Sequence, residues 1–421
     1  MPLTPRPSRP SPAGASPGPR SLAPDLARGF MLLVIATVHA HMFRQIATGG
    51  EAFSLAGSLD VAVTGFMTLF AESRGYPMFA ALFGYGVARI HLRRTAEGRQ
   101  WPWVRSLLRR RGRWMVVIGL LHTALIFHGD IIAVYGLIAL LFAGLLQLGD
   151  RRLLAHGLVW MSIGSLVYSA AETLISVSGA QQSVAVEVTP LVDLFMRLGA
   201  WPVLAVLLVL ISVFPFSVGV WAARYRLLEE PDRHLPFLRR VAMIGIPLSV
   251  LGAVPQTLVL IRVWAPEIVL QVGAKWLHVL SGYAGGFGYA ALIALVAVAI
   301  GDRRGPIVRA LAATGERSMT CYLLQSVAWV ALFMPYTLNL AARLDDAQSV
   351  LLGAGVWAVT VAVAAFMARF GLRGPAEAFL RRMTYGPTGR GTPEPAPVGA
   401  EPFDEATSGS QSASGERTTG G

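Results

Sequence analysis

Residues 201–225 read WPVLAVLLVLISVFPFSVGVWAARY, and Arg224 is the one charged side chain among them. A helix needs about 20 apolar residues to cross the hydrocarbon core of a bilayer, so this stretch predicts a transmembrane helix. Similar blocks recur along the 421 residues, which are 54% hydrophobic and 14% charged. Soluble domains carry about 25% charged residues. We therefore expect an all-α, polytopic integral membrane protein.

Apolar blocks predict about ten transmembrane helices within one domain, residues 25–386. The blocks are Leu26–Phe43, Pro77–Ile90, Trp114–Phe127, Ile131–Leu148, Leu153–Val177, Trp201–Tyr225, Val241–Val263, Trp276–Ile300, Ser318–Tyr336 and Val350–Phe370. The stretch Asp60–Phe70 predicts an additional half-helix or interfacial helix, broken at Gly75 and Pro77. Residues 1–24 and 387–421 are rich in Pro, Gly and Ser and predict disordered tails.

Arginine sets the expected orientation. The formal net charge is +12, and arginines concentrate in every second loop between the apolar blocks. Cytoplasmic loops of membrane proteins carry such an excess, so both termini are predicted to lie in the cytoplasm. The basic residues are explained by topology, so the bilayer is the expected partner and nucleic acid is not.

The first block carries an arginine and a histidine on one helical face. Arg28 and His39 are eleven residues apart, which corresponds to nearly the same direction and roughly 16 Å along a helix. His39 would lie near mid-membrane, where a histidine suits general-base catalysis. Arg28, near the inner surface, suits binding of a phosphate-bearing donor. In the alternative, Arg28 anchors the helix and pairs with Asp25, while His39 joins two helices by a hydrogen bond.

The next candidates lie in a tight hairpin. Asp130 follows Gly129 and opens a helix, where its simplest role is an N-cap. His122 falls near mid-membrane, so His39, His122 and Asp130 are candidate catalytic residues if their helices adjoin. No spacing matches a metal motif, so no metal is expected. The lone cysteine, Cys321, predicts a small packing residue.

The ninth block supplies further candidates. Gly315 breaks the chain, and Glu316 follows near a helix start, where the helix dipole favours an anion. Predicted donor-binding residues are Asp25, Arg28, Glu316 and Arg317. Predicted substrate-lining residues are Tyr135, Tyr322, Gln325 and Ser326. In the alternative, this polar face joins helices to one another.

Four segments together resemble the YeiB-like bacterial membrane proteins, also described as domain of unknown function 418. The segments are Asp25-x-x-Arg28-Gly29-Phe30, Phe79-x-x-Leu-Phe83-Gly84-x-Gly86, Gly119-Leu-x-His122 with Gly129-Asp130-Ile-x-x-x-Tyr135, and a C-terminal part. That part reads Gly315-x-Arg317-x-x-Thr320-x-Tyr322-Leu-x-Gln325-Ser326 and later Gly374-Pro375-x-Glu377-x-x-x-Arg381-x-x-Thr384-Tyr385-Gly386.

The resemblance implies a multi-pass protein of the bacterial cytoplasmic (inner) membrane. This family is grouped with membrane acyltransferase-like proteins, which implies transfer of an acyl group from a cytoplasmic acyl-CoA co-substrate to a lipid-linked or envelope glycan acceptor, without a bound cofactor. The acyltransferase-family-three enzymes carry the Arg28–His39 spacing, whereas typical YeiB-like members have Asn at the position of His39. A small-solute transporter and a non-catalytic envelope protein are the alternative hypotheses.

Overall fold

The computed structural model describes residues 21–47, 57–178 and 189–386, and the regular structure of these ranges is helical. The α-helices are α1 (Leu22–Ala47), α2 (Ser58–Phe70), α3 (Gly75–Ala96), α4 (Trp101–Leu125), α5 (Ile131–Leu141), α6 (Asp150–Val177), α7 (Pro190–Arg224), α8 (Leu235–Leu260), α9 (Ile268–Ile300), α10 (Pro306–Glu316), α11 (Ser318–Phe333), α12 (Asp346–Arg369) and α13 (Pro375–Tyr385). Short 3-10 helices are η2 (Ala143–Gln147), η3 (Pro231–His234) and η4 (Leu340–Ala342). The all-α prediction is confirmed.

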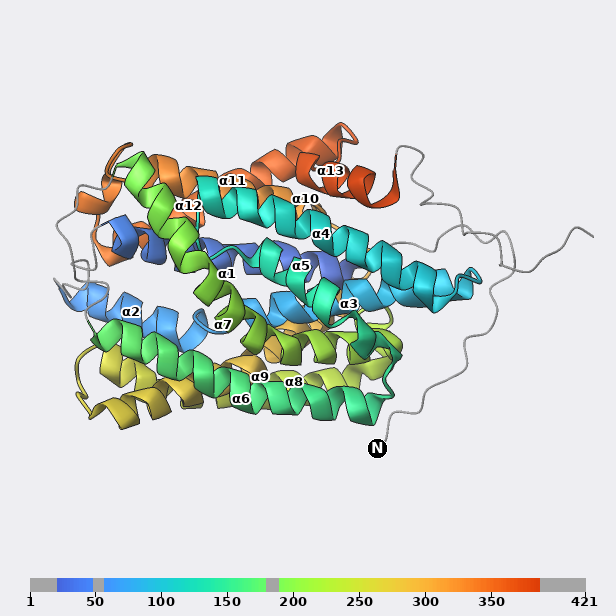
Figure 1. The fold of residues 1–421 in the computed structure, drawn as a ribbon, viewed down its shortest axis with the longest axis horizontal. Coiled ribbons are helices and arrows are strands. Elements are labelled where there is room, and N and C mark those ends of the chain that lie inside the picture. The colour runs from blue at the N-terminus through green and yellow to red at the C-terminus, as the bar shows by residue number, and fades with distance from the viewer. Residues whose placement is uncertain (1–20, 48–56, 179–188, 387–421) are drawn as a thin grey trace, which may run out of the picture.

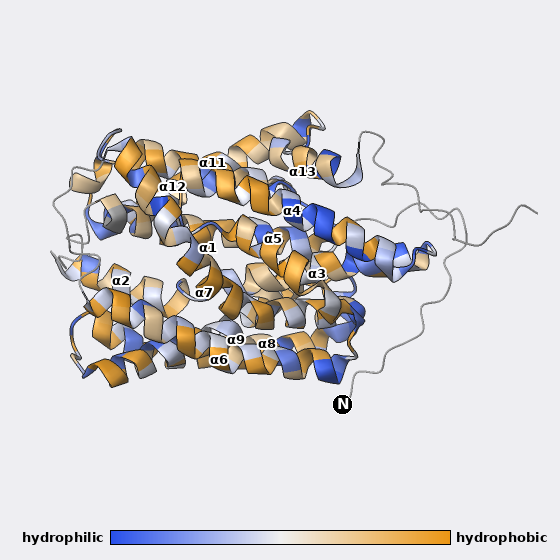
Figure 2. Ribbon diagram, in the orientation of Figure 1, coloured by the Kyte–Doolittle hydropathy of each residue, from blue (hydrophilic) through white to orange (hydrophobic). Residues whose placement is uncertain are grey.

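The long helices lie side by side along one axis (Figure 1). Apolar residues dominate the middle of this bundle, and hydrophilic residues gather toward its ends, densely where α3 ends and α4 begins (Figure 2). Large apolar side chains face outward, such as Leu121 at 58%, Leu251 at 69% and Val269 at 75% exposure. A soluble monomer rarely exposes such extensive apolar surface, so this surface faces lipid and the chain is a multi-pass membrane protein.

Each predicted apolar block falls on a helix, but the blocks differ in their ability to span a bilayer. In the described ranges, six helices are both long and apolar enough to cross a membrane, namely α1, α6, α7, α8, α9 and α12. The apolar helices α5 and α11 are shorter. The block Ile131–Leu148 is not one helix, because α5 ends at Leu141 and η2 follows. Ten crossings and the cytoplasmic termini therefore stay predictions.

The predicted domain limits can be compared with the structure only at the start of the domain. Helix α1 begins at Leu22, three residues before the expected start at residue 25. The expected tails, 1–24 and 387–421, otherwise lie outside the described residues.

The short helix expected before the second span is present as α2, although the interruption lies elsewhere. The chain turns at Ala71–Arg74, and Gly75 begins α3. Pro77 lies in the first turn of α3, where a backbone N–H has no partner within the helix in any case. The missing N–H of proline is thus harmless there, and the prediction of a break at Gly75 and Pro77 was wrong by a few residues.

A fully buried arginine holds this turn together. Arg74 Nη1 donates to the carbonyl oxygen of Thr68 at 2.8 Å and to that of Glu72. Its Nε donates to Ser249 Oγ at 2.8 Å, and its Nη2 donates to the Ser249 carbonyl oxygen at 2.7 Å. Carbonyl groups at a helix end carry partial negative charge, so the guanidinium compensates the end of α2.

The small-residue face of α9 packs against the same turn. A Cβ at Gly282 would lie 2.3 Å from the Ser73 carbonyl oxygen, and one at Gly286 would lie 2.9 Å from that of Arg74. Glycine at both positions therefore lets α9 approach this turn closely.

At its other end, α1 is joined to α12 by charge. Arg44 Nη1 lies 2.6 Å from Asp346 Oδ1, and His41 Nδ1 lies 3.3 Å from the same oxygen. The carboxylate is buried, so it needs these partners to stay ionised.

Candidate functional site

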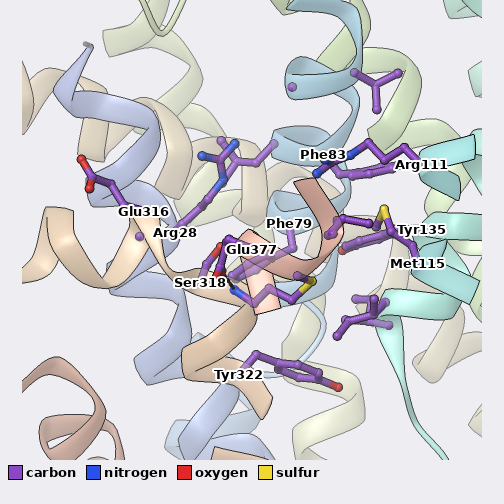
Figure 3. Close-up of a pocket in the computed structure, with 18 of the residues that line it drawn as sticks. Arg28, Phe79, Phe83, Arg111, Met115, Tyr135, Glu316, Ser318, Tyr322 and Glu377 are labelled. Carbon is purple, nitrogen blue, oxygen red and sulfur yellow. Dashed lines mark hydrogen bonds between the residues drawn. The ribbon is translucent and has the colours of Figure 1, made fainter. Parts of the chain in front are cut away.

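A cavity of about 370 Å³ lies between α1, α3, α4, α5, α10, α11 and α13. One end of it is polar, with Arg28 and Arg111, and Tyr322 lies at the other end (Figure 3). Its walls between these ends are apolar or aromatic. They include Phe79, Leu82, Phe83, Val87, Ile90, Met115, Ile131, Ile132 and Tyr135. The arrangement suits an elongated molecule with an anionic end and an apolar end.

Arg28 is placed by a very close contact between α1 and α10. A Cβ at Gly29 would lie 2.2 Å from the Leu311 carbonyl oxygen, and one at Gly315 would lie 1.8 Å from that of Asp25. The Asp25 side chain is not part of the cavity wall, and its Oδ1 accepts a 3.3 Å hydrogen bond from Arg28 Nη1. Asp25 thus positions Arg28, and its predicted direct contact with a donor is not favoured by this geometry.

Arg111 is a residue that the sequence analysis missed. It lies in a run of arginines on α4, and the sequence does not indicate which of them turns inward. Arg111 lines the cavity, and in the described ranges no carboxylate pairs with it. Arg111 adds a second guanidinium to the polar end of the cavity, and arginine is the side chain best suited to contact a phosphate.

Glu377 is the second residue that was missed, although it belongs to a segment that carried the resemblance. Its Oε1 accepts from the backbone N–H of Met319 at 2.8 Å and of Thr320 at 3.1 Å, and its Oε2 accepts from Thr320 Oγ1 at 2.5 Å. A carboxylate from α13 therefore caps the start of α11. Together with Glu316, it lines the cavity beside Arg28.

The α4–α5 hairpin holds a buried histidine–carboxylate pair. His122 Nδ1 lies 2.8 Å from Asp130 Oδ1, and the side chains are 1% and 0% exposed. An ionised carboxylate only accepts hydrogen bonds, so the proton of a neutral His122 lies on Nδ1. Asp130 Oδ2 also accepts from the backbone N–H of Ala133 at 2.6 Å, which confirms the predicted N-cap. His122 Nε2 is buried and has no hydrogen-bond partner among the described residues.

Glycine permits this pairing. A Cβ at Gly119 would lie 2.2 Å from Asp130 Oδ2 and 2.3 Å from the backbone nitrogen of Ala133. Only a residue without a side chain lets the start of α5 approach α4 so closely, one turn before His122. The spacing of Gly119, His122 and Asp130 in the sequence therefore has a direct structural reason.

Tyr322 links the cavity to both histidines. Its ring centroid lies 5.3 Å from that of His122 and 5.9 Å from that of His39. The predicted proximity of His39 and His122 is thus seen around this tyrosine, yet neither histidine lines the cavity. His39 also lies 4.9 Å from the Phe127 ring. Unlike His122, it has no carboxylate hydrogen bond among the described residues.

Tyr135 and Tyr322 line the cavity, as expected for substrate-lining residues, while two others do not. The Tyr135 ring stacks on Phe83 at 4.9 Å. Gln325 Nε2 donates to Thr360 Oγ1 at 3.2 Å, and Ser326 Oγ donates to the Tyr322 carbonyl oxygen at 3.1 Å. Gln325 thus contacts α12, and Ser326 bonds to the backbone of its own helix, so neither side chain reaches the cavity.

Arg317 also turns away from the cavity. Its Nη2 donates to the Leu372 carbonyl oxygen at 2.7 Å, and its Nη1 donates to that of Ala313 at 3.1 Å. It therefore ties the α12–α13 connection to α10, and the donor-binding prediction gains no support for this residue.

The described residues contain neither a cluster of metal ligands nor an exposed thiol. Over the residues described, no group of three His, Cys, Asp or Glu side chains could hold a metal ion. Cys321 is 1% exposed, and its Sγ lies 4.0 Å from the Thr360 carbonyl oxygen.

Comparisons with known proteins agree with the resemblance seen in the sequence. Residues 222–387 match the family described as "Protein of unknown function (DUF418)". The chain is also similar to the protein named "Uncharacterized protein YxaH" from Bacillus subtilis (strain 168), with 25% identity over 353 residues that cover 77% of this chain and 83% of the relative. No solved structure matches the chain.

Proposed function

We propose that this protein transfers an acyl group. The family that residues 222–387 match is described only as of unknown function, so we argue the proposal from the site. The donor is an acyl thioester of the acyl-CoA type, and the acceptor is a hydroxyl group of a lipid-linked or envelope molecule. The observation that carries the proposal is a cavity with two arginines at one end and Tyr322, beside the His122–Asp130 pair, at the other.

The cavity supports the donor half of the proposal. Arg28 and Arg111 bind the phosphate groups of the donor, for which arginine is the best suited side chain. The apolar wall between them and Tyr322 takes the acyl part. Arg111 forms no ion pair with a carboxylate in the described chain, so its N–H groups can contact a ligand in the cavity that it lines.

The histidine–carboxylate pair supports the chemical half. His122 Nε2 takes the proton of the acceptor hydroxyl while the oxygen attacks the thioester carbonyl carbon. The C–S bond then breaks, and the thiolate takes the proton back from His122 to leave as a thiol. Asp130 holds the productive tautomer and stabilises the imidazolium, which is the role of the carboxylate in Ser-His-Asp enzymes.

Tyr322 determines when this reaction can start. His122 Nε2 is buried outside the cavity wall, next to the Tyr322 ring. The tyrosine side chain must therefore turn aside before the acyl carbonyl and the base meet. His39, on the other side of the same ring, is the competing base.

Donor binding is tested first, by thermal unfolding of the detergent-purified chain with acetyl-CoA, decanoyl-CoA or free CoA. A ligand that binds only the folded state raises the unfolding temperature with concentration. We expect a shift that Arg111→Gln abolishes, and that Arg240→Gln, which removes an exposed arginine of α8, preserves. Equal shifts in both variants would refute the arginine assignment.

Transfer is tested next in proteoliposomes that contain bacterial envelope lipid extract and radiolabelled acyl-CoA. General-base catalysis contributes about 10²–10⁴-fold. His122→Gln should lower the rate of label transfer by that factor while the donor-induced thermal shift remains. If His39→Gln abolishes transfer and His122→Gln does not, then His39 is the base. Donor binding without transfer in any extract would refute catalysis.

The transporter alternative relies on the helix interruption before α3, because transporters bind substrates at broken helices. In this chain, Arg74 fills the interruption, and its donors go to backbone and serine oxygens of the protein. Each nitrogen of this buried guanidinium is thus hydrogen-bonded within the protein, which favours a structural role for the interruption.

A further inference from the structure

A second hollow, of about 400 Å³, lies on the α4–α5 hairpin. Its lining residues are Pro102, Arg105, Ser106, Arg109, Arg113 and Leu140. None of these residues lines the cavity described above. The two spaces therefore require separate explanations.

Three arginines form one row along this hollow. Arg105, Arg109 and Arg113 follow one another at four-residue spacing, so the row extends about 12 Å along α4. All three are exposed, and in the ranges that the structure covers none pairs with a carboxylate. By contrast, Arg94 at the end of α3 pairs with Glu97 at 2.7 Å. The row is thus an uncompensated positive charge.

The row continues directly into apolar surface. At the same four-residue spacing, Val117 and Leu121 of α4 are 42% and 58% exposed. Leu141 of α5, next to the lining residue Leu140, is 69% exposed. Figure 2 shows this change along α4, from hydrophilic to apolar. A surface with cations beside an apolar band matches an amphiphile whose head is anionic and whose chains lie along the helices.

We propose that this groove binds a phospholipid that carries two phosphodiester groups. The three guanidinium groups are spread over about 12 Å, so a single phosphate group cannot contact all of them. Two phosphate groups joined by a short linker can extend along the row. The acyl chains then lie on the surface formed by Val117, Leu121 and Leu141. The positive-inside rule explains why arginines occur near a membrane surface, but it does not require them to line a hollow.

Native mass spectrometry of the full chain tests this proposal. The protein is extracted from phosphatidylcholine vesicles doped either with diphosphatidylglycerol or, at equal total charge, with phosphatidylglycerol, and the retained lipid is counted. Each arginine near an anionic lipid contributes about fivefold in affinity, so replacing three by glutamine should weaken retention of the diphosphate lipid about 100-fold.

The matched control is the triple variant Arg303→Gln, Arg304→Gln and Arg309→Gln, which removes three exposed arginines around the start of α10. It should keep the preference for the diphosphate lipid, and both triple variants should unfold at the temperature of the unaltered chain. Equal loss in both variants would reduce the effect to general charge attraction. Displacement of the lipid by inorganic pyrophosphate at similar concentration would identify a soluble phosphate as the ligand, and would overturn the proposal.

Discussion

Replacement of Asp130 by asparagine should reverse the tautomer of His122 while the fold survives. In Asp130→Asn, the side-chain oxygen can still accept from the Ala133 N–H, which is now 2.6 Å from Oδ2. The amide nitrogen then faces His122 Nδ1 and donates to it. His122 must in turn carry its proton on Nε2, the atom that the proposed reaction needs unprotonated.

The magnitude follows from the hydrogen bond that is exchanged. Nδ1 of His122 and Oδ1 of Asp130 are 2.8 Å apart, and a hydrogen bond to a charged group contributes about 1.5–3 kcal/mol. At about 1.4 kcal/mol for each factor of ten, the present tautomer is favoured roughly 10- to 150-fold. The variant loses this preference, so acyl transfer should fall by about 10²–10⁴. The cap survives, so stability should fall by only about 1–2 kcal/mol.

Selective ¹⁵N labelling of histidine measures the tautomer without any assumption about activity. The His122 resonances are assigned from the spectrum of His122→Gln, and the Nε2 signal should move from unprotonated to protonated in Asp130→Asn. An Nε2 that is protonated in the unaltered chain, or a spectrum that Asp130→Asn leaves unchanged, would refute the reasoning. Asp130→Ala, which removes both acceptors, should instead lower stability by about 2–5 kcal/mol.

Three stability predictions, each measured by chemical unfolding in detergent, concern the contacts that shape the bundle. Gly315→Ala places a Cβ 1.8 Å from a backbone oxygen and should cost about 1–3 kcal/mol. The control is Gly355→Ala in α12, where an added Cβ would meet nothing within 4 Å. It should leave stability unchanged or raise it by up to ~1 kcal/mol. Equal changes in stability for Gly315→Ala and Gly355→Ala would contradict the close α1–α10 contact. Asp346→Asn should cost about 3–5 kcal/mol, because it removes the buried carboxylate charge that contacts both Arg44 and His41. Arg74→Gln should cost at least about 3 kcal/mol, and a variant as stable as the unaltered chain would exclude the role given to Arg74.

The helices could be predicted from the sequence because lipid imposes a simple pattern on it. Each apolar block falls on one helix, except for Ile131–Leu148, which is divided between α5 and η2. The N-cap of Asp130 followed from a glycine–aspartate pair before an apolar run. The limits were less predictable, because helices such as α7, which starts at Pro190 and not near Trp201, extend beyond their apolar core. Apolar composition marks the bilayer, whereas hydrogen bonding alone decides where a helix begins.

The site was predictable only where its residues are close in sequence. His122 and Asp130 belong to one hairpin, so their proximity could be anticipated. The inward turn of Arg111, and the contact of Glu377 with the start of α11, depend on which helices adjoin. For the same reason, the sequence could not show that Tyr322 lines the cavity while Gln325 contacts Thr360 of α12. Helix neighbours are set by packing over the whole bundle, and spacing along one helix does not contain that information.

The cap that Glu377 provides has a consequence for the way the protein is made. Helix α13 follows all the other described helices in the chain, so the ribosome releases it after they have been synthesised. Membrane insertion and packing of the earlier helices can begin during synthesis. Until α13 arrives, the first backbone N–H groups of α11 lack their carboxylate, and the cavity lacks the wall formed by Glu377 and Leu380. A nascent chain therefore has an incomplete cavity, and we expect a premature stop codon before the last helix to leave the start of α11 without its carboxylate cap.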